Sequence, residues 1–224
     1  MTKLHTVLNS IKRDKRLILT SLIIGLIITL TWGLVSTAIY AREMQRGIAE
    51  RVVRLHVLPN SNSERDQALK LLVRDGILDI MHEFLTGDET KEDAIFLINS
   101  NIKLIEARAY QIIRENGADY KVSTDIIRER FPTRHYEGIT LPPGYYTALR
   151  IDIGEASGNN WWCIVFPPLC FVNATRSQRQ PTAETTLQNI LTAEQYDLVT
   201  ITPESGVRLQ ARFRIVELWQ NLIR

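Results

Sequence analysis

The sequence has no Asp, Glu, Lys or Arg at 25 consecutive positions, residues 17–41. At about 1.5 Å per residue, a helix of that length reaches ~37 Å, which is enough to cross a hydrocarbon core of ~30 Å. The absence excludes a plain soluble cytoplasmic domain, because a buried core helix is rarely apolar on all sides for so long. We therefore expect contact with a membrane through residues 17–41.

The rest of the chain lacks an excess of positive charge. Five of the 27 basic residues precede the apolar run, against one of the 25 acidic residues, which leaves 22 basic and 24 acidic groups in residues 42–224. A nucleic-acid-binding surface has no compositional support, so no nucleic-acid partner is expected. The basic cluster before the run places the N-terminus in the cytoplasm by the positive-inside rule, and the domain after it outside.

Two interpretations of this leader stay open. Ser36 and Ala38 are small residues that suit the −3 and −1 positions of a signal peptidase site, which favours cleavage. The apolar run is longer than the ~7–15-residue core of a usual signal peptide, which favours an uncleaved anchor. Both deliver the domain to the extracytoplasmic side, so we expect a membrane-anchored or secreted protein.

Cysteine is scarce, with only Cys163 and Cys170 in the chain. Export favours a disulfide between them, but seven extended steps would separate them by ~23 Å, whereas a disulfide needs Cα atoms within ~7 Å. Pro167 and Pro168 lie where the chain would have to reverse, so a disulfide predicts a tight loop. The alternative is two reduced core cysteines that flank a bend. Two thiols without a nearby histidine supply half of a zinc shell, so no metal site is expected.

Recognisable catalytic motifs are missing. No G-x-S-x-G, H-x-x-x-H or C-x-x-C occurs in the sequence. A dyad of Cys163 with His56 or His135 is conceivable, but a cysteine in a core strand is a poor nucleophile because burial disfavours the thiolate. An exported thiol or cell-wall hydrolase is therefore kept only as the alternative function, and we expect no enzyme and no cofactor.

Hydrophobic periodicity predicts an α+β fold. Alternation over residues 51–58 predicts a strand, and apolar residues three and four apart predict two helices, from about 64 to 85 and from 90 to 117. Residues 120–126, 144–153 and 161–166 alternate again and predict three strands joined as an antiparallel meander. The expected domain therefore has two helices packed on an antiparallel sheet.

Polar residues mark the start of the first helix. Ser63 with Asp66, or Ser61 with Glu64, provides a capping box. Asp66 and Lys70 stand four apart, an order that supports an exposed helix face, so we interpret the charges of this helix as a solvated face. Paired carboxylates for acid–base catalysis are the alternative.

The C-terminal part of the chain has a different pattern. A polar stretch predicts a linker, Thr185 can cap a short helix, residues 197–202 predict a strand, and residues 207–215 alternate between an apolar and a basic face. Together these predict a C-terminal β-hairpin appendage. The expected organisation is a leader and membrane or signal segment at 1–41, an extracytoplasmic α+β domain at 48–172, and a linker, short helix and hairpin at 173–224.

Two adjacent tryptophans open the last predicted strand of the domain. Adjacent strand residues point to opposite faces, so Trp161 and Trp162 cannot enter one core. We expect one to be covered by the helices. The other is either a partner-binding anchor beside the Pro-Pro loop or is covered by the C-terminal segment.

Three motifs, in residues 54–75, 131–154 and 158–171, carry a family resemblance. With N-W-W-C-I-V-F-P-P-L-C as the most specific part, they resemble the stage II sporulation protein R family of endospore-forming Firmicutes. The resemblance implies an exported signal, made in the forespore, that acts in the space between forespore and mother cell. It also implies a partner, a membrane-embedded aspartic protease in the mother-cell membrane, which when activated processes the precursor of sigma factor E.

The resemblance supplies no catalytic residues, so the contact surface is a hypothesis drawn from the sequence. We expect the protease to meet two segments, because polar caps and aromatic side chains concentrate there without a catalytic purpose. The expected contact residues are Asn60, Ser61, Asn62, Ser63, Asp66, Trp161, Trp162, Pro167 and Pro168, and Cys163 and Cys170 are the expected disulfide.

Overall fold

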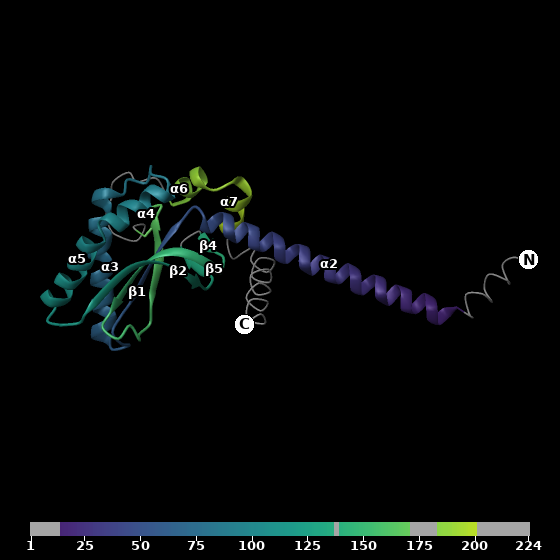
Figure 1. Cartoon of the computed structure of the whole chain (residues 1–224), viewed down its shortest axis with the longest axis horizontal. Helices are drawn as coiled ribbons and strands as arrows, with labels where there is room; N and C mark the ends of the chain where they lie inside the picture. The colour runs from purple at the N-terminus through teal and green to yellow at the C-terminus, as the bar shows by residue number, and fades with distance from the viewer. Residues whose placement is uncertain (1–13, 137–138, 171–182, 201–224) are drawn as a thin grey trace, which may run out of the picture. The chain divides into compact units, whose positions relative to one another are not determined.

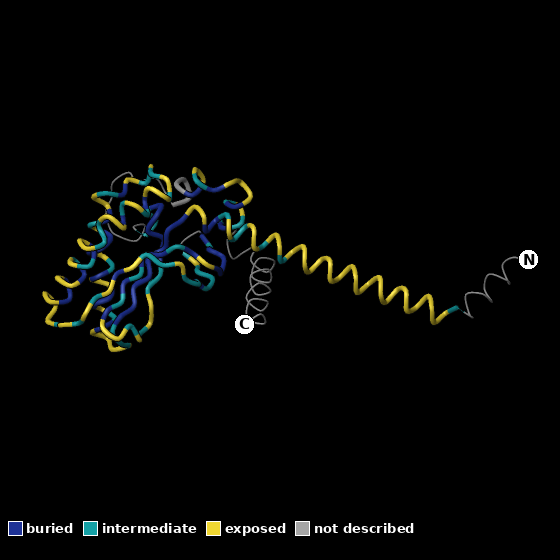
Figure 2. The backbone as a smooth tube through the Cα atoms, viewed as in Figure 1, coloured by how far each residue is buried: buried dark blue, intermediate teal, exposed yellow. Residues whose placement is uncertain are grey.

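The computed structural model describes residues 14–136, 139–170 and 183–200. The chain divides into two compact units, Met1–Glu43 and Met44–Arg224. Helix α2 (Lys15–Ala49) begins in the first unit and ends in the second; it is long and apolar enough to cross a membrane, and the large apolar side chains of its first-unit part are exposed (Figure 2). An apolar surface of this extent needs a non-aqueous environment, which fits the expected membrane anchor or signal sequence.

The second unit is α+β, as expected (Figure 1). Among the described residues, helices cover both faces of a four-stranded sheet, and a separate two-stranded sheet packs against one of these faces. The elements in chain order are β1 (Val53–Leu58), α3 (Glu64–Phe84), α4 (Lys91–Ser100), α5 (Ile102–Glu115), β2 (Val122–Phe131), β3 (Arg134–Tyr136), β4 (Ile139–Leu141), β5 (Gly144–Ile153), β6 (Trp161–Phe166), α6 (Ala183–Ile190) and α7 (Ala193–Thr200).

The expected cap of the first helix is confirmed at Ser63, but the second helix is not continuous. The Ser63 hydroxyl accepts a hydrogen bond from the Asp66 amide at 3.2 Å, where α3 begins. The expected helix from 90 to 117 is divided at Asn101 into α4 and α5. The Asn101 side chain donates to the Leu97 carbonyl, and asparagine competes in this way with the helical backbone. Gly117 ends α5 in the left-handed region, as expected.

The expected antiparallel meander is wrong, because β1 lies in the middle of the sheet. The strand order is β2-β5-β1-β6, with β1 parallel to β5 and antiparallel to β6. A parallel neighbour needs a long crossover, and the three helices between β1 and β2 supply it. All six residues of β1 are buried, which is the environment of a central strand covered on both faces.

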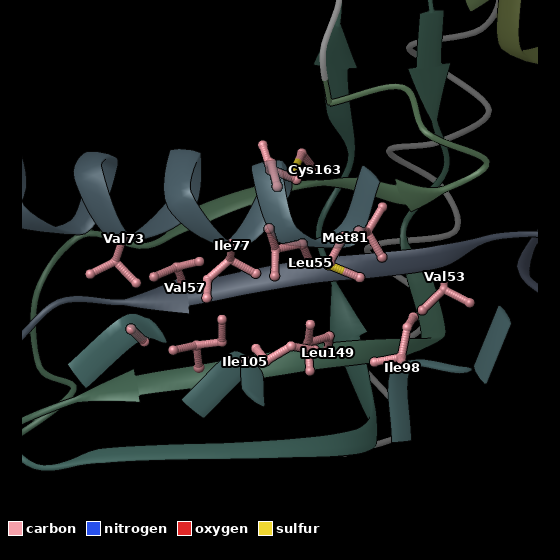
Figure 3. Close-up of a cluster of buried hydrophobic side chains, with 14 of the residues drawn as sticks. Val53, Leu55, Val57, Val73, Ile77, Met81, Ile98, Ile105, Leu149 and Cys163 are labelled. Carbon is pink, nitrogen blue, oxygen red and sulfur yellow. The ribbon is translucent and has the colours of Figure 1, made fainter. Parts of the chain in front are cut away.

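Helices α3 and α5 cover one face of the sheet. The main hydrophobic core lies between these helices and the sheet. Figure 3 shows Val73, Ile77 and Met81 of α3 above Leu55 and Val57 of β1. Each of these five side chains is at most 1% exposed. Burial of apolar area of this kind, worth about 25 cal/mol per Å², holds the helices on the sheet.

The second face of the sheet is covered in part by the end of α2, helices α6 and α7 and the β3–β4 hairpin. The strand expected at 197–202 is wrong, since α7 runs to Thr200. Thr192 and Gln195 form a reciprocal capping box, with backbone-to-side-chain distances of 3.1 and 3.3 Å, and Val199 is fully buried. The cap and the buried face outweigh the local strand preference. The predicted linker and terminal hairpin lie largely outside the described residues.

Candidate functional site

The loop after β1 and the loop before β6 are joined by hydrogen bonds and together form one surface. We call residues 59–66 and 154–160 the loop pair. Asn60 Oδ1 accepts from the Glu155 amide at 3.1 Å, and the Ser157 hydroxyl donates to the Asn60 carbonyl at 2.7 Å. Asn62 Oδ1 accepts from the Asn159 amide at 2.6 Å. Two of the expected contact residues therefore order the backbone of a second loop.

Asp66 is the centre of the loop pair. Its buried carboxylate accepts hydrogen bonds from Ser61 at 2.6 Å, Asn60 at 3.0 Å and Tyr120 at 3.1 Å. Burial by itself raises the pKa of Asp66, but these hydrogen bonds favour the ionised form and bring the pKa below its ordinary value. The carboxylate thus joins the turn to α3 and to the segment before β2.

The expected solvated face does not include Asp66 and Lys70, which are 4% and 5% exposed. The two residues do not pair with each other. The Lys70 ammonium instead donates to Gln67 at 2.6 Å and to the Asn159 carbonyl at 2.8 Å. Burial lowers the pKa of Lys70. Sequence spacing predicted an i,i+4 pair, but the long lysine stem allows the charge to reach the loop pair instead.

We expect Asp66→Asn to lower the free energy of unfolding by about 1.5–3 kcal/mol near pH 7, the usual range for hydrogen bonds to a charged group. Because the folded-state pKa lies below the unfolded value of about 3.9, this stabilisation is complete above that pH and is lost as the pH falls through the folded-state pKa. Urea unfolding of both proteins between pH 7 and 2.5 measures the effect. The two stability curves should converge in acid, and curves that stay parallel would contradict the assignment.

Trp161 and Trp162 point to opposite faces of the sheet, as expected. Trp161 packs on the helix side, where the Arg74 guanidinium carbon lies 4.2 Å from its ring centroid. Trp162 packs on the second face, where the guanidinium carbon of Arg134 lies at 3.9 Å. Each indole is partly exposed, and an arginine guanidinium stacks on its ring. Trp161 directly follows the loop pair, so one of the two tryptophans joins that surface.

The segment from Cys163 to Cys170 closes on itself. The two sulfurs form a disulfide with the Cα atoms 5.7 Å apart, which confirms the expected tight loop. The Leu169 amide donates to the Pro167 carbonyl at 2.8 Å within the turn. Pro167 and Pro168 follow the far end of β6, about 17–20 Å of strand from Trp161. The structure therefore separates them from the loop pair.

A row of polar side chains crosses the second face of the sheet, and the sequence prediction missed it. His56 Nδ1 lies 2.7 Å from Glu129, Glu129 lies 3.6 Å from Arg150, and Arg150 lies 2.8 Å from Asp152. Hydrogen bonding to Asp152 raises the pKa of Arg150. The available signal was a pair of charged or imidazole residues two positions apart in each strand, Arg54 and His56 in β1 and Arg150 and Asp152 in β5. Arg54, two residues before His56, faces the same way.

Comparison with known proteins finds a match over the part of the chain that contains the sheet and the loop pair. The family model of stage II sporulation protein R matches residues 49–176, which is more than half of the chain. This chain belongs to the stage II sporulation protein R family. Stage II sporulation protein R of Bacillus subtilis strain 168 is 34% identical over 131 residues, which cover 58% of this chain and 58% of that protein. No solved structure matches.

The stage II sporulation protein R match contains the whole four-stranded sheet, α3 to α5, the loop pair and the disulfide. Most of α2 and both α6 and α7 lie outside it. The resemblance found in the sequence motifs is thus confirmed, and family membership supports a role in sporulation. The partner surface expected at the loop pair and at both tryptophans remains a hypothesis.

The Cys163–His56 dyad considered for a thiol hydrolase is not formed in this stage II sporulation protein R family member. Cys163 is bonded to Cys170, and neither cysteine of the chain is free. His56 also lies on the opposite face of the sheet from Cys163, because Cys163 pairs with Leu55 and Trp162 pairs with His56. Within the described ranges, no three His, Cys, Asp or Glu residues are grouped as a metal site would require.

Proposed function

We propose that the chain is an exported sporulation signalling protein with its domain in the space between forespore and mother cell. There it activates a membrane-embedded aspartic protease in the mother-cell membrane, which then processes the sigma factor E precursor. Membership of the stage II sporulation protein R family carries this proposal. An apolar N-terminal helix and a disulfide support it, because disulfides persist in extracytoplasmic compartments.

We propose that the loop pair and Trp161 together form the receptor contact. The loop pair is braced by side-chain hydrogen bonds, so it presents a preformed polar surface that loses little entropy on binding. Trp161 stands at its border, partly exposed and stacked on Arg74. Tryptophans in this position are frequent energetic anchors of protein interfaces. Pro167 and Pro168 follow the other end of β6 and are not part of this narrower proposal.

Reconstitution of the full-length chain with the candidate protease and its sigma-factor substrate tests the proposal. Trp161→Ala should reduce the rate of precursor processing by about 30-fold if the indole contributes the ~2 kcal/mol typical of an interface anchor. Phe96→Ala is the matched control, because Phe96 is an aromatic residue of α4 with 70% exposure and lies outside the proposed contact. We expect this control to process the precursor at the wild-type rate.

Two outcomes would contradict parts of the proposal separately. A wild-type chain that does not stimulate processing contradicts protease activation. Stimulation that survives Trp161→Ala moves the contact to another surface. Release of fragments from purified cell wall by the same wild-type preparation would favour the cell-wall hydrolase instead.

A further inference from the structure

A cation is buried on the second face of the sheet without an acidic partner in the part of the chain that the structure describes. Arg54 is 0% exposed, and none of the described acidic residues forms an ion pair with it. Its Nε donates to the Cys163 carbonyl at 2.9 Å and its Nη2 to the Tyr136 hydroxyl at 2.6 Å. Arginine stays protonated in proteins, and burial of an uncompensated charge costs several kcal/mol. An arrangement of this kind calls for an anion.

A second guanidinium lies nearby. Arg134 of β3 stacks on Trp162 of β6, and its charge lowers the pKa of Arg54 in addition to the larger effect of burial. Aromatic rings hold Arg54 from the other sides, with the centroids of Phe131 and Tyr146 4.4 and 5.2 Å from its guanidinium carbon. Two like charges are thus kept close together by rings, which offer cation–π attraction but no counter-charge.

Three N–H groups of this cluster have no acceptor. Arg54 Nη1, Arg134 Nε and Trp162 Nε1 are each inaccessible to solvent and unpaired among the described residues. They come from β1, β3 and β6, three elements that meet on one face. An unmade hydrogen bond of a buried donor costs about 1–3 kcal/mol, so three in one place indicate an acceptor outside the described residues.

We infer that Arg54, Arg134 and Trp162 form a binding site for a single carboxylate, presented by an Asp or Glu side chain of a partner polypeptide. A carboxylate is planar and has two oxygens with about four acceptor positions, which suit three N–H donors. Glu129 lies near the site, because it pairs with His56, whose ring contacts Trp162, and its charge disfavours a multiply charged phosphate or nucleic acid.

The cluster borders the surface on one side, although its three unpaired donor atoms are covered. Arg134, Tyr136 and Trp162 are each only partly buried, whereas Arg54 is enclosed. A side-chain carboxylate would therefore meet Arg134 first and then extend over Trp162 toward Arg54. Such a site would bind an acidic side chain whether or not a membrane protease is the protein that presents it.

Indole N–H signals in NMR spectra of the full-length chain in detergent micelles test the inference. The probes are acetyl-Gly-Glu-Gly-amide and its Gln counterpart at equal ionic strength. The Glu peptide should move the Trp162 Nε1–H signal downfield with a dissociation constant on the order of 1 mM, a weak value suited to one charged contact. A Trp162→Phe variant identifies that signal, and the Gln peptide should leave it in place.

The variant Arg134→Gln should weaken binding of the Glu peptide by about tenfold or more. Arg74→Gln is the matched control, because Arg74 stacks on Trp161 in the same way on the opposite face; it should bind the Glu peptide like the wild type. An unchanged Trp161 signal reports that Arg134→Gln is folded, and an unchanged Trp162 signal in the absence of peptide reports that Arg74→Gln is folded. Equal responses to both peptides, no response to either, or wild-type binding by Arg134→Gln would each overturn the inference.

Discussion

Replacement of Leu55 by alanine is expected to lower the free energy of unfolding by about 3–5 kcal/mol. Leu55 is 0% exposed in the central strand β1, between Leu149 of β5 and Cys163 of β6. A cavity at this point is enclosed by strands on two sides and by α3 on a third, so the surroundings can relax only in part. Many domains have a total stability of 5–15 kcal/mol, so this one change would remove a large share.

Urea unfolding of the full-length chain in detergent, followed by tryptophan fluorescence, measures the change. Leu72→Ala is the matched control: the same atoms are removed from α3, but Leu72 is 45% exposed. We expect a loss below about 1 kcal/mol for this control. Similar losses for the two leucines would show that β1 is not the buried centre of the sheet.

The double variant Cys163→Ala/Cys170→Ala is expected to lose about 2–3 kcal/mol of stability. The disulfide closes a short loop, and the loss of this constraint on the unfolded chain is worth about that much in the entropic model. A reducing agent should destabilise the wild type by a similar amount and leave the double variant unchanged. Unfolding midpoints with and without dithiothreitol measure both effects.

Thiol titration of the unreduced, unfolded wild type provides the check on that prediction. No free thiol is expected, because Cys163 and Cys170 are bonded to each other. Two free thiols, together with a wild type that is insensitive to reductant, would contradict the disulfide.

Local signals predicted the helices better than the sheet. The cap at Ser63 and the stop at Gly117 depend on hydrogen bonds within a few residues, so the sequence pattern contains them. Asn101 shows the limit, because its side chain divides a helix that apolar spacing alone makes continuous. Strand order depends on partners far along the chain, and a pattern of alternation is the same for a meander and for an inserted strand.

The candidate site was predicted in part for the same reason. Asn60 and Asn62 were predicted as contact residues, but their hydrogen bonds to residues 155–159 depend on the position of β6. Arg54 and His56 were missed as part of a polar row because alternation places them on the face opposite Leu55 and Val57 but does not tell what covers that face. They are buried, since the hairpin β3–β4 and the C-terminal helices cover that side of the sheet.

The central place of β1 has a consequence for how the domain folds. β1 is the first strand to be synthesised, yet Arg54 reaches its hydrogen-bond partner Cys163 109 residues later. Pairings so distant in sequence are slow to form, and folding cannot proceed progressively from the N-terminus. Any chain that stops before β6 leaves one edge of an apolar strand open to other molecules. Incomplete chains should therefore aggregate, and only the complete domain should escape proteolysis.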